Sequence, residues 1–168
     1  MKSLFLTLAG YHAWATETLF DTLVTLDDAR YRADCGLFFR SVHGTLNHLL
    51  VADNVWFARL RGEQFAVSGL DAELEQDRDR LEQALCAASA RWQAWLEPCD
   101  DAALGAPLRY RNMSGASFEQ PLPLVLSHVF NHGTHHRGQI STVLTQAGLP
   151  APEMDLVYYL RRAQPEAS

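Results

Sequence analysis

The chain has 168 residues, 48% of them hydrophobic, and its 14 basic and 20 acidic side chains give a formal net charge of −6. This length predicts one domain, residues 1–168, that can bury a core, and the hydrophobic content excludes a disordered protein. The basic residues are scattered rather than clustered, which argues against a groove that binds nucleic acid.

We expect neither a targeting segment nor a membrane span. Polar residues interrupt the apolar residues at the start of the chain, unlike a signal peptide, and no run of 18 apolar residues lacks charge. The cysteines are odd in number, far apart and without CxxC spacing. We interpret Cys35, Cys86 and Cys99 as reduced thiols of a cytoplasmic protein.

Apolar residues at helical spacing predict a first helix over residues 3–27. Gly10 lies inside it at a cost of roughly 1 kcal/mol relative to alanine, so packing or a close backbone approach should justify it. Residues 28–40 are predicted to form a connector that places Phe38 and Phe39 against the core.

The second predicted helix covers residues 41–61, with Ser41 as its N-cap. Its apolar arc is broad, so we expect burial on more than one side, and His48 lies within that arc. Asp53 is an acid between apolar neighbours. We interpret it as part of a structural ion pair or a hydrogen bond to the backbone rather than as a catalytic group.

Asp71 is predicted to open the third helix, with Glu73 and Glu75 in its first turn, where they favour the helix dipole, and Pro98 marks its end. Alternating residues after it predict a short β-hairpin with a turn at residues 113–115. A short helix or ordered tail is expected from Asp155 onward.

The longest predicted helix covers residues 122–147, and it contains HVFNHGTHHRGQ, which holds four of the seven histidines. His132 and His136 share one face with apolar side chains. Those apolar residues are Val125, Val129, Ile140 and Val143. That face should point into the core, where an imidazole without a partner is costly, and a pair four residues apart can close on one metal ion.

Periodicity alone leaves alternatives open. A single buried histidine is more often a hydrogen-bonded core residue than a ligand. His128 and His132 form a second pair four residues apart, so spacing does not select the ligands. His135 lies about 100° around the helix from His136, and we interpret it as a surface or interface residue.

Four long helices, one long connection and a small hairpin predict an all-α bundle, in which facing helices can build a metal site. Helix two would supply His48. Three histidines with an open position resemble a catalytic site for a divalent metal, and the ExxH spacing of a di-iron centre is absent. Because free imidazole titrates near pH 6.5, metal affinity should fall at lower pH.

Three segments together resemble the DinB family of the DinB/YfiT-like superfamily. They are GTLNHLLVAD from Gly44 to Asp53, HVFNHGTHHRGQ from His128 to Gln139, and DLVYYLR from Asp155 to Arg161. The resemblance implies a four-helix bundle, commonly a homodimer. It also implies a metal, zinc or nickel, held by His48, His132 and His136, the three histidines that the helix faces place inward.

The function implied by the resemblance is a metal-dependent enzyme, specifically a thiol-dependent S-transferase that joins a low-molecular-weight thiol to an electrophilic small molecule. Asn131, Arg137 and Gln139 would then have supporting roles. The alternative is a non-catalytic metal-bound dimer that acts as a stress-response or scaffold protein, and a third is a bundle without metal. The damage-inducible behaviour that gives the family its name describes regulation rather than chemistry.

Overall fold

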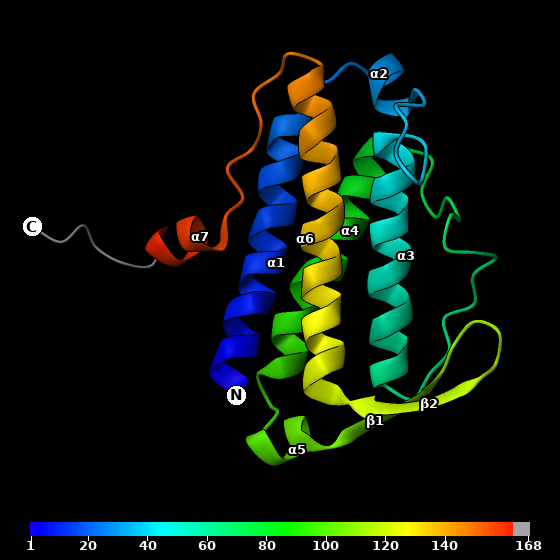
Figure 1. Cartoon of the computed structure of the whole chain (residues 1–168), viewed down its shortest axis with the longest axis vertical. Coiled ribbons are helices and arrows are strands. Elements are labelled where there is room, and N and C mark those ends of the chain that lie inside the picture. The colour runs from blue at the N-terminus through cyan, green and yellow to red at the C-terminus, as the bar shows by residue number, and fades with distance from the viewer. Residues whose placement is uncertain (163–168) are drawn as a thin grey trace, which may run out of the picture.

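The structure, a computed structural model, describes residues 1–162, and this part of the chain is mostly helical with one small hairpin. Four long helices lie side by side along one axis (Figure 1). They are α1 (Lys2–Leu23), α3 (Val42–Leu60), α4 (Arg78–Leu96) and α6 (Leu122–Gln146). Helix α1 packs against α4 and α6, and α3 packs against the same two helices. The expectation of a mostly helical protein is confirmed.

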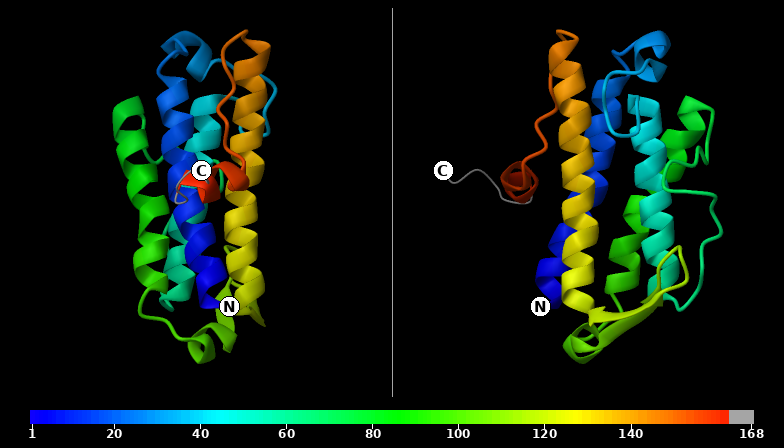
Figure 2. Two further views of the ribbon diagram at one scale, coloured as in Figure 1. Left: turned by 90° about the vertical axis from the view of Figure 1, so that its left-hand side faces the viewer. Right: turned by 45° about the vertical axis from the view of Figure 1, so that its right-hand side comes forward.

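Shorter elements connect and cover the long helices. They are α2 (Asp28–Arg32), α5 (Asp101–Gly105), β1 (Pro107–Arg111), β2 (Ser117–Pro121) and α7 (Leu156–Arg162). The two strands pair antiparallel and contact α3 and α6 near the ends of those helices (Figure 2). The predicted hairpin is confirmed, and Gly115 takes a positive φ of 87° at its turn. No helix in residues 1–162 combines the length and the hydropathy needed to cross a membrane.

The buried apolar residues form two clusters. One gathers Leu19, Leu46, Leu81 and Ile140 with their neighbours, and the other gathers Phe5, Trp92, Leu126 and Phe130 with theirs. Buried polar residues occupy the intervening positions on the long helices. They include His12, Asp53, His136 and Arg137. The core therefore carries a polar layer between two apolar ones, at mid-height of the long helices.

The first helix ends at Leu23 rather than at residue 27, because Asp27 is the N-cap of a new helix. Asp27 has extended backbone angles, and its side chain accepts a hydrogen bond from the Arg30 N–H at 2.9 Å. The short helix α2 lies in the segment predicted as a plain connector. Of the aromatic pair beyond it, Phe39 is buried, but Phe38 is 83% exposed, so the prediction holds for one ring and is wrong for the other.

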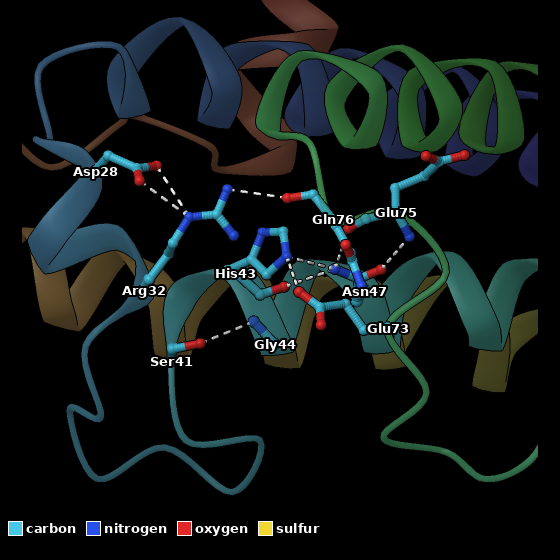
Figure 3. A network of polar contacts seen from close by, with 9 residues as sticks. All are labelled: Asp28, Arg32, Ser41, His43, Gly44, Asn47, Glu73, Glu75 and Gln76. Atoms are coloured by element: carbon cyan, nitrogen blue, oxygen red, sulfur yellow. Dashed lines mark hydrogen bonds and ion pairs between the residues drawn. The ribbon is translucent and has the colours of Figure 1, made fainter.

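The prediction that Asp71 opens the third helix is wrong. The cap is Asp77, whose side chain accepts from the Arg80 N–H at 2.9 Å, and α4 begins at the next residue. The residues before it bind α3 instead (Figure 3). The Asn47 side chain donates to the Glu75 carbonyl and accepts from the Glu75 N–H, each at 3.0 Å. Those backbone groups are consequently not available to a helix.

The end of the described chain packs on α1, and this explains Gly10. A Cβ at Gly10 would lie 2.1 Å from the Tyr159 hydroxyl, so only glycine admits this ring of α7. The neighbouring Tyr11 hydroxyl donates to the Met154 carbonyl at 2.8 Å. Figure 2 shows α7 lying across α1. Of the two alternatives predicted for this segment, a short helix or an ordered tail, the structure has the helix.

Cys35, Cys86 and Cys99 are free thiols, and each is half-buried. Burial raises the pKa of the Cys86 thiol to about 11, so this side chain is uncharged near neutral pH. The interpretation of the cysteines as reduced is thus in agreement with the structure, while a cytoplasmic location stays a prediction from their pattern.

Candidate metal centre

Three histidine side chains from two helices converge in one place. His48 comes from α3, and His132 and His136 come from successive turns of α6. The Nε2 atom of His132 lies 3.1 Å from that of His48 and 3.2 Å from that of His136. One ring nitrogen of each residue lies within 4.8 Å of the other two, so the group could bind a metal ion.

The outer nitrogens of two of these rings are held by hydrogen bonds. His48 donates from Nδ1–H to the Leu70 carbonyl at 2.8 Å, and His136 donates from Nδ1–H to Gln139 Oε1 at 2.7 Å. A neutral imidazole has one N–H, so Nε2 of both rings presents a lone pair to the centre of the group. A single N–H on His132 Nε2 cannot point at both of these lone pairs, whereas a cation between the three nitrogens would attract all of them.

The spacing of the nitrogens fits such a cation. A tetrahedral zinc ion with bonds of 2.0–2.1 Å places its ligand nitrogens about 3.3 Å apart. The two Nε2–Nε2 distances of 3.1 and 3.2 Å are close to this value. Imidazole donors suit zinc, nickel, copper and iron, and three of them leave a coordination position open. The donor set therefore fits one divalent metal ion.

Burial keeps these rings neutral, which is the form that coordinates a metal. Desolvation, helped by the nearby rings of His136 and His48, lowers the pKa of His132 to about 3. Desolvation also lowers the pKa of His136 to about 4, although its hydrogen bond to Gln139 acts in the opposite direction. The pKa of His48 is lowered by burial as well. At neutral pH little proton release is then needed before coordination.

Comparison with known proteins agrees with this picture. The family model described as "DinB family" matches residues 1–167. The chain belongs to the DinB family. It is 28% identical to "Protein DinB" of Bacillus subtilis (strain 168), and the match covers 91% of each chain. The family resemblance drawn from the three sequence segments is confirmed.

One side of the candidate site in this DinB-family chain is closed by Phe39. Its ring stacks on the His48 ring with centroids 3.7 Å apart and an interplanar angle of 15°, and it meets His136 edge-on at 5.7 Å. Phe39 was expected to pack against the core, but not beside the histidines. The His48 and His136 side chains are buried, whereas His132 is half-buried and gives the group its contact with solvent.

The other two histidines of the motif lie outside the group. His128 is exposed and packs edge-on against Trp56, with ring centroids 5.3 Å apart, and His135 is exposed beside His136. The structure therefore brings together the pair His132 and His136 and leaves out the rival pair that includes His128. The interpretation of His135 as a surface residue agrees with its exposure.

Asp53 belongs to a separate buried network next to the candidate site. Its Oδ2 lies 3.1 Å from His12 Nε2, and its Oδ1 accepts from Trp92 Nε1–H at 3.3 Å. The other nitrogen of the His12 ring accepts from Arg137 Nη1 at 3.0 Å. This agrees with an ion-pair role for Asp53, but the partners are side chains rather than backbone groups.

Of the three residues expected to support the site, Gln139 contacts a candidate ligand directly, Arg137 joins the buried network, and Asn131 is exposed. Sequence reasoning missed His12 and the Leu70 carbonyl. His12 had a signal, since it lies one turn from buried residues on both sides of it in α1. The role of Leu70 had none, because a backbone carbonyl is supplied by any residue.

Proposed function

We propose that His48, His132 and His136 hold one divalent metal ion through Nε2 in a DinB-type four-helix-bundle domain over residues 1–168. The observation that carries the proposal is the convergence of three Nε2 atoms, two of which have their lone pairs turned inward by Nδ1–H bonds. Zinc and nickel are the ions that we favour, because the donor set is entirely imidazole.

We propose further that the site is catalytic and acts on a low-molecular-weight thiol. Three protein donors with an open position are typical of catalytic rather than structural sites, and a bound divalent ion would favour the thiolate form of a sulfur ligand. Phe39 excludes water from the buried side of His48, and the half-buried His132 leaves an approach from solvent. The thiolate sulfur would form a bond to an electrophilic carbon, the thiol proton would pass to solvent, and the leaving group would depart with the electron pair.

Metal analysis of protein purified without a polyhistidine tag tests the first proposal. We expect about one zinc or nickel ion per chain, retained through gel filtration and removed by a strong chelator. Failure of the chelated, folded protein to take up stoichiometric zinc or nickel would overturn the assignment.

An assay of thiol consumption tests the second proposal. The metal-loaded protein, with a small thiol and an electrophile such as a monohalobimane, should consume thiol faster than the chelated protein does. Stoichiometric metal without any metal-dependent turnover over a panel of thiols would favour the alternative, a non-catalytic metal-bound protein with a stress-response or scaffold role.

We propose that the protein forms a homodimer. The family resemblance implies a homodimer, although the chain itself covers two tryptophans that an interface would otherwise cover, since Tyr110 packs on Trp56 and Tyr159 on Trp14. A different observation supports the proposal. Helix α7 has no buried residue, and three of its apolar side chains are about two-fifths exposed. Sedimentation should show a dimer at micromolar concentration, and a monomer there would contradict this.

A further inference from the structure

A cavity of about 780 Å³ lies beside the C-terminal half of α3, outside the histidine group. Its walls are α3, the loop at residues 62–67 and the β-hairpin. The volume falls within the range of small-molecule sites in proteins. Three of the residues that line it are aromatic, namely Phe65, Tyr110 and Phe118, and the last two stack with ring centroids 5.7 Å apart.

Arg59 provides this cavity with a positive charge that lacks an acidic partner. Its guanidinium lies 4.4 Å from the centroid of the Trp56 ring and 4.9 Å from that of Tyr110, so two aromatic rings hold it in place. Among the residues that the structure describes, no carboxylate lies within ion-pair distance of Arg59. The side chain is half-buried, and burial lowers the pKa of its guanidinium. A bound anion would offset this cost of desolvation.

The acidic residues of the cavity are already neutralised. Glu119 forms an ion pair with Arg109 at 2.5 Å, and Glu63 forms one with Arg61 at 2.8 Å. In a chain with a net charge of −6, the described walls of the cavity thus have two arginines without an ion-pair partner, the half-buried Arg59 and the exposed Arg111, and no unpaired carboxylate. A negatively charged ligand is favoured over a neutral or positive one.

The cavity is linked to the candidate metal centre by contacts between rings and through the loop. Trp56 packs on Tyr110 on one side and on His128 on the other, at 5.2 and 5.3 Å between centroids, and His128 packs on His132 at 5.7 Å. The loop that walls the cavity continues to Leu70, whose carbonyl holds the His48 ring. A ligand in the cavity would therefore lie against the same segments that position the histidines.

We propose that this cavity binds a small organic anion with an aromatic body, its carboxylate on Arg59 and its ring against Tyr110 and Phe118. The inference deepens the proposed function, because it takes this anion as the substrate class of the metal centre. The binding itself depends only on the cavity, so it can be tested with or without metal.

The test is calorimetric titration with phenylacetate, and with its neutral isostere 2-phenylacetamide, of the metal-loaded and the chelated protein. We expect phenylacetate to bind at least about tenfold more tightly than the amide, because only the carboxylate accepts a hydrogen bond from Arg59 as a charged group. Arg59→Met should remove this preference, and Arg59→Lys should keep part of it because the charge stays. Arg80→Met is the matched control, since Arg80 is exposed on α4 and does not line the cavity, and it should leave both affinities within about twofold.

Phenylacetate that binds no more tightly than the amide, that keeps its affinity in Arg59→Met, or that shows no saturable binding up to about 10 mM overturns the inference. Metal content measured on the same samples separates this outcome from failure of the proposed function. A protein that holds metal but does not prefer the anion disproves the cavity assignment alone. A protein that prefers the anion but takes up no metal disproves the metal centre alone.

Discussion

Two groups of buried polar side chains lie next to each other on α6, and they differ in whether donors meet acceptors. In the network of His12, Asp53 and Arg137, each short contact joins an N–H to a lone pair, and one proton on the His12 ring satisfies both of its neighbours. In the group of His48, His132 and His136, nitrogen faces nitrogen. In the first group these contacts pair donors with acceptors, although Arg137 Nε has no partner, whereas the second group presents more lone pairs than protons at its centre and could bind a cation.

The comparison shows why adjacent residues can have different roles. His136 and Arg137 follow each other in sequence, yet one ring faces α3 and the candidate site, while the Arg137 side chain is 1% exposed and reaches toward α1. Burial alone therefore does not distinguish a site from a structural network. The pairing of donors and acceptors does.

Removing one of the proposed metal ligands should give the largest effect. In His136→Ala we expect stoichiometric metal binding to be lost, since only two imidazoles remain, while the fold is destabilised only moderately because the apolar stripe of α6 stays. Metal content and the thermal midpoint measured together test this. His135→Ala, at the exposed neighbouring position, is the control and should keep its metal. Full occupancy in His136→Ala would remove His136 from the site.

Breaking the network of His12, Asp53 and Arg137 should cost stability. Arg137→Met removes the buried donor of His12 Nδ1, and leaving a buried acceptor without a partner typically costs about 1–3 kcal/mol. Urea denaturation of the metal-free protein measures this. A loss below about 1 kcal/mol would show that the network is not a significant stabilising element.

Two glycines of α6 differ in whether they lie against the network of His12, Asp53 and Arg137. A Cβ at Gly133 would lie 2.6 Å from His12 Cε1 and 2.9 Å from Arg137 Nη1, so Gly133→Ala should disturb the network and cost about 1–3 kcal/mol. Gly138 has nothing within 4 Å of such a Cβ, so Gly138→Ala should stabilise the helix by up to about 1 kcal/mol. Equal changes of the thermal midpoint in the two variants would contradict this packing.

Over the single unit from pH 7 to pH 6, protonation should have a modest effect on stability. The folded pKa values of about 4 for His136 and about 3 for His132 lie below the unfolded value near 6.5. The unfolded chain therefore binds more protons, and the stability of the metal-free protein is full above pH 6.5 and is lost as pH falls toward 4 and then 3. Between pH 7 and 6 the loss should be roughly 0.5–1 kcal/mol per ring. A metal-free His132→Ala variant should have a shallower dependence, and an identical slope would contradict these pKa shifts.

The same pKa values change the expected pH dependence of metal binding. Competition from protons was expected to begin near the value of free imidazole. In the structure, burial moves that competition for His132 and His136 to lower pH. Metal titrations should show weakened affinity mainly below pH 5 rather than at 6.5.

Much of the architecture could be predicted from local patterns. The spacing of apolar residues located the four long helices, and the glycine and proline signals placed the ends of α6 within one residue of the structure. The start of α4 was predicted six to seven residues early, because Asp71 and Asp77 are equally good caps in isolation. Asp77 rather than Asp71 is the N-cap because the side chain of Asn47, which is distant in sequence, forms hydrogen bonds with the backbone of Glu75.

For the candidate site, too, one part could be predicted from local patterns and another part could not. The sequence by itself determined that His132 and His136 share an inward face and that His48 lies on an apolar arc, because helical periodicity is a local property. Only the tertiary structure decided that these rings converge through Nε2, that His128 stays outside, and that Phe39, Gln139 and the Leu70 carbonyl orient them. Which ring nitrogen carries the proton depends on an acceptor, and for His48 that acceptor comes from a loop 22 residues away, whose position depends on packing rather than on periodicity.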